Sequence, residues 1–73
     1  MMNADDIKKG IEYMKAQKKS LEKEMLDLKT HLVMGIYDMG SEELLTVANK
    51  IACLERRIEA GQSKINLVEL IVR

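Results

Sequence analysis

The chain has 73 residues, and its twelve basic and twelve acidic side chains give a formal net charge of zero. A chain this short buries only about 60% of its unfolded surface, so we expect one small domain, residues 1–73, that gains stability from association. The charge balance disfavours a nucleic-acid partner, and the single cysteine excludes an internal disulfide.

The composition predicts an all-α protein. Proline, tryptophan and phenylalanine are absent and 33% of the residues are charged, which is typical of long amphipathic helices and coiled coils. The opening "MMNADDIKKG" carries acids and lacks the apolar core of a signal peptide, and no window has the length of apolar sequence that spans a membrane. We expect a soluble cytoplasmic protein without membrane insertion, and the lone thiol agrees with a reducing compartment.

The first expected helix covers residues 3–35. Its apolar residues alternate at spacings of four and three, which is the heptad pattern of a coiled-coil seam. Asn3 is the expected N-cap, and the acids after it suit the positive end of the helix dipole. The seam consists of Ile7, Ile11, Met14, Leu21, Met25, Leu28 and Leu32, with Lys18 in the gap and Gly35 at the next step.

A turn is expected at residues 36–40. Gly35, Asp38 and Gly40 are predicted to make the reversal, because glycine and aspartate are typical turn residues. The apolar residues among them, Ile36, Tyr37 and Met39, are predicted to cover the end of the core.

The second expected helix covers residues 41–72, with Ser41 as its cap. Gly61 is the one non-standard step of its seam and leaves two interpretations open. The helix continues through Gly61, or "EAGQS" stops it and Ser63 caps a short third helix. The seam consists of Leu44, Val47, Ile51, Leu54, Ile58, Ile65, Val68 and Val72.

The two expected helices have nearly equal lengths, so they predict an antiparallel two-helix hairpin of the coiled-coil type. A fold centred on Asp38 sets Ile7 near Val68 and Lys18 opposite Ile58. The same register sets Met14 near Gly61, where the flexible thioether fills the space that glycine leaves.

Apolar residues beyond the seam predict contacts with other proteins. They lie near the turn and near the C-terminus, and two alanines of the second helix form a small-residue track. Two interpretations remain open, docking onto a larger helical partner and self-association into a homodimeric four-helix bundle. The candidate partner-binding residues are Val33, Met34, Ile36, Leu45, Ala48, Ala52, Leu67, Leu70 and Ile71.

Catalytic and cofactor motifs are missing from the sequence. His31 is the only histidine and lies far along the hairpin from Cys53, so no metal cluster or Cys–His pair is expected. Phosphate-binding loops and nucleophile elbows are also absent. We therefore expect a non-enzymatic protein without a metal or cofactor.

The segments "LEKEMLDLKTHLVMG" and "ANKIACLERRI" resemble the small E-type co-chaperones of bacterial type III secretion systems. The similarity is carried by Leu28, Lys29, Met34 and Gly35 in the first segment and by Lys50, Leu54, Glu55 and Ile58 in the second. It implies a cytoplasmic helical hairpin that binds a tetratricopeptide-like second chaperone. Through that chaperone it would help to keep the needle subunit soluble before export.

A second similarity has different implications. The segment "SEELLTVANKIACLERRI" also resembles the helical hairpins that dephosphorylate a response regulator in the sporulation phosphorelay. Their motif has an acidic residue where this chain has Ala52, and their first helix is shorter. A nucleic-acid-binding bundle is a further alternative, which the net charge disfavours.

Overall fold

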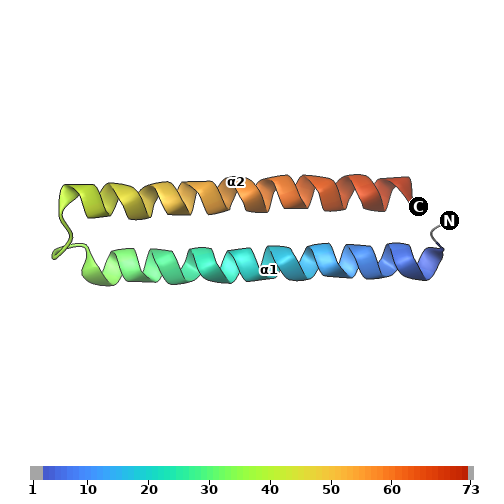
Figure 1. The fold of residues 1–73 in the computed structure, drawn as a ribbon, viewed down its shortest axis with the longest axis horizontal. Coiled ribbons are helices and arrows are strands. Elements are labelled where there is room, and N and C mark those ends of the chain that lie inside the picture. The colour runs from blue at the N-terminus through green and yellow to red at the C-terminus, as the bar shows by residue number, and fades with distance from the viewer. Residues whose placement is uncertain (1–2, 73) are drawn as a thin grey trace.

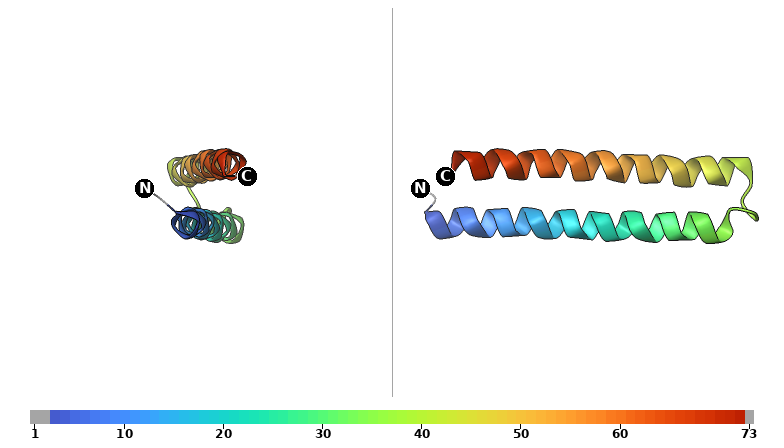
Figure 2. Two further views of the ribbon diagram at one scale, coloured as in Figure 1. Left: turned by 90° about the vertical axis from the view of Figure 1, so that its right-hand side faces the viewer. Right: turned by 180° about the vertical axis from the view of Figure 1, so that it is seen from behind.

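The computed structural model describes residues 3–72 and consists of two long helices joined by a short turn. Helix α1 spans Ala4–Gly35 and helix α2 spans Ser41–Ile71. The helices lie side by side and antiparallel, so the start of α1 is beside the end of α2 (Figure 1). The molecule measures 54 × 16 × 14 Å, and no third layer covers either face of the described part (Figure 2). The predicted all-α helical hairpin is therefore confirmed.

Helix α1 begins as the sequence predicts. The side-chain oxygen of Asn3 accepts a hydrogen bond from the backbone N–H of Asp6, at 2.9 Å. This contact satisfies one of the free N–H groups at the helix start. Asp5 and Asp6 add negative charge to the first turn, where the helix dipole is positive.

Helix α2 begins at Ser41, as predicted, but its N-cap residue differs from the prediction, and the helix does not stop early. Gly40 occupies the N-cap position with an extended backbone, and no side chain caps the helix. The prediction of Ser41 as the cap is wrong, because Ser41 is already the first helical residue. The helix then continues through Gly61 to Ile71, so the alternative with a short third helix is also wrong.

The core is the heptad seam between the helices. Every predicted seam position is buried or half-buried except Val72, which is 42% exposed. Among the described residues only Val47, Leu54 and Ile65, all on α2, are buried. A hairpin of two helices has no third element to cover the outer edges of its seam, so most seam side chains stay partly open to water.

The turn closes through backbone hydrogen bonds. The carbonyl oxygen of Gly35 accepts from the N–H groups of Asp38 and Met39, at 3.0 and 3.1 Å. Met39 is half-buried, but Tyr37 is fully exposed and Ile36 is 46% exposed. The prediction that these residues cover the core end holds for Met39 and is wrong for Tyr37, since the chain turns outward there.

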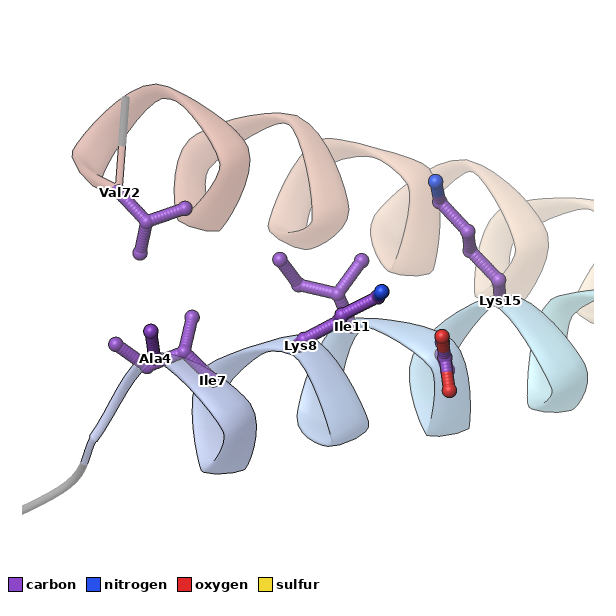
Figure 3. A pocket seen from close by; sticks show the side chains of 7 residues that line it. Ala4, Ile7, Lys8, Ile11, Lys15 and Val72 are labelled. Atoms are coloured by element: carbon purple, nitrogen blue, oxygen red, sulfur yellow. The ribbon is translucent and has the colours of Figure 1, made fainter.

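The register is displaced from the prediction by up to about one helical turn. At the open end, Ile7 lines one hollow with Val72 (Figure 3), and it lines a second hollow with both Val72 and its predicted partner Val68. The cause is the turn, because the backbone keeps curling through residues 36–38 before the chain crosses over. The reversal is therefore centred beyond Asp38.

The displaced register brings the two exceptions of the seam together. Lys18 and Gly61 line one hollow of about 130 Å³ between the helices, and Met14 lines it as well. A Cβ atom added to Gly61 would have nothing within 4 Å. The interpretation of Gly61 as a packing notch filled by Met14 is therefore wrong, because no atom packs closely against it.

Candidate protein-interaction surfaces

One face of the hairpin is identified by an ion pair between the helices. Nζ of Lys15 lies 3.2 Å from Oε1 of Glu69, and both side chains are well exposed. Lys8, Glu12 and Lys15 line a hollow of about 400 Å³ on the same side of the seam, where Figure 3 shows Lys15 reaching toward α2. We call this side the Lys15–Glu69 face.

The other side of the seam carries a different set of charges. A hollow of about 470 Å³ there has acidic residues on α1 and basic residues on α2. We call it the Lys50–Arg57 face. Its lining residues are Glu24, Asp27, Leu28, Lys50, Cys53, Leu54 and Arg57.

An apolar surface lies beside the turn on the Lys15–Glu69 face. Residues separated by a multiple of seven lie on the same side of a helix in a coiled coil. Ile36 is three heptads after Lys15 and therefore lies on its side of α1, and Ala48 is three heptads before Glu69 and lies on its side of α2. Leu26 and Val33 follow Glu12 by two and three heptads and therefore join them. This turn-end surface comprises Leu26, Val33 and Ile36 on α1 and Leu45, Ala48 and Ala52 on α2.

The members of the turn-end surface are accessible. Val33 is 72% exposed, and Leu26 and Leu45 are each 63% exposed. Ala48 is exposed, and Ala52 is half-buried. Larger side chains thus occupy the α1 half of this surface, and two alanines form much of the α2 half.

A second apolar surface lies at the open end of the hairpin. Ile71 follows Lys64 by one heptad, so it belongs to the Lys50–Arg57 face, and Leu67 and Leu70 flank it. All three are more than half exposed. Ile71 also lines an apolar hollow of about 380 Å³ with Gly10 and Met14. We call Leu67, Leu70 and Ile71 the open-end surface.

The nine predicted partner-binding residues therefore do not form one continuous site. Five of them belong to the turn-end surface, three to the open-end surface, and Met34 lies beside Val33 in a shallow hollow on the outside of α1. The two surfaces are at opposite ends of the molecule and on opposite faces.

Two exposed apolar residues were missed by the sequence-based prediction. Leu26 lines the same outer hollow as Val33, and Tyr13, 66% exposed, follows Gly10 at the open end. Leu26 precedes Val33 by one heptad, and this spacing is the signal that identifies it. Tyr13 precedes Met34 by three heptads, and this longer spacing places it on the same side of α1 as Met34.

The described residues contain no cluster of three or more histidine, cysteine or acidic side chains placed to hold a metal ion. His31 and Cys53 are both exposed, on different helices. Within residues 3–72, neither helix has the apolar length that crossing a membrane requires.

Comparisons of the chain with protein-family models, curated proteins and solved structures found no match. The features that bear on function are therefore the two apolar surfaces and the resemblance of the two sequence segments.

Proposed function

We propose that the protein is a non-enzymatic co-chaperone that binds a tetratricopeptide-like chaperone. In this proposal the pair keeps the needle subunit of a type III secretion system soluble in the cytoplasm until export. The hairpin stabilises the second chaperone, and its contact with the needle subunit is indirect.

The observation that supports a binding function is the distribution of apolar side chains. In the part of the chain that the structure describes, three residues are buried, whereas large apolar residues such as Val33, Met34, Leu67 and Ile71 are more than half exposed. Exposed apolar patches of this kind mark protein contacts. A helical-repeat chaperone offers an extended concave surface on which a long narrow hairpin can lie.

The first test is co-purification of the tagged protein from its native host, with partners identified by mass spectrometry. The proposal predicts recovery of a helical-repeat chaperone in a one-to-one complex, with or without a needle-like subunit. Recovery of a response regulator, or of this chain alone, would refute the co-chaperone function.

The second test uses variants of the two surfaces. Leu45→Asp and Leu70→Asp are expected to reduce the recovered partner by about tenfold or more, because each places a charge in an apolar contact. Ser63→Asp is the matched control, since Ser63 is exposed and precedes Leu70 by one heptad. All three variants should keep the helical circular dichroism signal, because none of the changed residues belongs to the seam. Loss of helicity in both leucine variants would contradict the separation of seam from binding surface.

A further inference from the structure

We propose that the turn-end surface joins two copies of this chain into a four-helix bundle with both turns at the same end. This inference goes beyond the proposed function, because it concerns the purified chain without any partner. It rests on the exposed area, on the sizes of the side chains and on the charges of the Lys15–Glu69 face.

The single hairpin exposes more surface than a compact monomer of the same mass. The chain exposes 6090 Å². A compact monomer of 8.3 kDa would expose about 4,600 Å². If each copy buried the excess of roughly 1,500 Å², the interface would total about 3,000 Å², which lies within the range of obligate homodimers.

The side-chain sizes on the turn-end surface are complementary when α1 of one copy lies over α2 of the other. The α1 half presents Leu26, Val33 and Ile36, and the α2 half presents Ala48 and Ala52 together with one large residue, Leu45, nearest the turn. Large side chains of one copy would then pack over small ones of the second copy. The alternative two-fold arrangement, with α1 over α1, would place the two turns at opposite ends, so the turn-end surface of each copy would lie over the open end of the other.

The charges on the same face favour the same arrangement. On the α2 side, the three charged residues are all glutamates, whereas on the α1 side four lysines are accompanied by three acids. The α2 residues are Glu55, Glu59 and Glu69, and the α1 residues are Lys8, Lys15, Lys19 and Lys29 with Asp5, Glu12 and Glu22. Placing α1 over α2 therefore sets net positive against net negative charge, which favours this partner orientation.

The register supplies one specific contact for the test. Lys18 lies beside Gly61, so Lys19 and Glu59 are at the same height along the hairpin. Both belong to the Lys15–Glu69 face, since Lys19 follows Glu12 and Glu59 follows Ala52 by one heptad each. In the proposed bundle, Lys19 of each copy faces Glu59 of the second copy.

Sedimentation equilibrium of the full-length purified chain tests the interface. The wild-type protein is expected to have twice the mass of 8.3 kDa. Ala48→Arg should raise the dissociation constant by at least about tenfold, because arginine fills the space between the two layers and repels the lysines across it. Ala60→Arg is the matched control, an exposed alanine of α2 on the Lys50–Arg57 face, and it should leave the dimer unchanged. Circular dichroism checks that both variants stay helical.

A charge exchange tests the orientation. Lys19→Glu and Glu59→Lys should each weaken the dimer, and the double variant should restore it. A wild-type protein that stays monomeric at about 0.1 mM would overturn the proposal, since its dissociation constant would then lie above that concentration. Equal weakening by Ala48→Arg and Ala60→Arg, or a double variant no tighter than the single ones, would also overturn it. None of these outcomes depends on whether the chaperone partner is found.

Discussion

Replacing Gly61 with alanine should stabilise the protein. Gly61 lies inside α2, where glycine costs about 0.8–1 kcal/mol relative to alanine. An added Cβ would meet nothing within 4 Å, so no steric cost opposes this gain. The methyl group would also enter the hollow beside Lys18. We expect a gain of about 1 kcal/mol, which for a domain of this size raises Tm by about 4–8 °C.

Thermal unfolding followed by circular dichroism measures this gain, at one fixed chain concentration because association also shifts Tm. Gly10→Ala is the matched control, an exposed glycine inside α1 where an added Cβ also has nothing within 4 Å. Both variants should have a higher Tm, because alanine has a higher helix propensity than glycine. Any additional rise in Tm for Gly61→Ala reports filling of the hollow. A lower Tm for Gly61→Ala, with the expected rise for Gly10→Ala, would refute the argument and indicate close packing of α1 against Gly61.

Three further substitutions test local features of the fold. Asn3→Ala should cost about 1 kcal/mol, because the N–H of Asp6 loses its partner, whereas Asn3→Ser should be nearly neutral in the same thermal melt. Lys18→Leu should raise Tm by burying apolar surface in the seam, and light scattering will show whether the oligomeric state changes. An unchanged state would mean that Lys18 does not fix the register. Glu69→Gln should cost at most about 1 kcal/mol, because its pair with Lys15 is exposed, and the difference from wild type should shrink in high salt.

The helices and their seam could be predicted from the sequence because heptad spacing directly encodes which side of a helix is apolar. This spacing alone assigns the seam positions, which run from Ile7 to Leu32 in α1 and from Leu44 to Val68 in α2. All of these seam positions are buried or half-buried. The cap of α1 was also predictable, since two acids, Asp5 and Asp6, and a periodic apolar run follow Asn3 within one helical turn. The N-cap of α2 was harder to assign, because Gly40 and Ser41 are both acceptable N-caps and lie next to each other.

The register could not be predicted from the same pattern. Sliding one helix past the other by a turn keeps every apolar residue in the seam, so heptad spacing does not distinguish the two alignments. The geometry of residues 36–40 decides between them, and the sequence does not specify how far the backbone curls before it crosses over. One feature of the sequence favours the observed alignment. The long side chain of Lys18 is best accommodated opposite Gly61, which has no side chain.

The partner-binding residues show a related limit of sequence analysis. A residue outside the seam is predicted to be exposed, and exposure was correct for Val33 and Ile71. The face on which Val33 or Ile71 lies follows from its heptad distance to a reference residue such as Lys15 or Lys64. These reference residues are assigned to a face by the ion pair and by the hollows between the helices, which only the structure supplies. The consequence concerns the shape of any partner. A flat surface can cover only one of the two apolar surfaces, whereas a concave helical-repeat partner that surrounds the narrow hairpin can contact both, as the expected effects of Leu45→Asp and Leu70→Asp require.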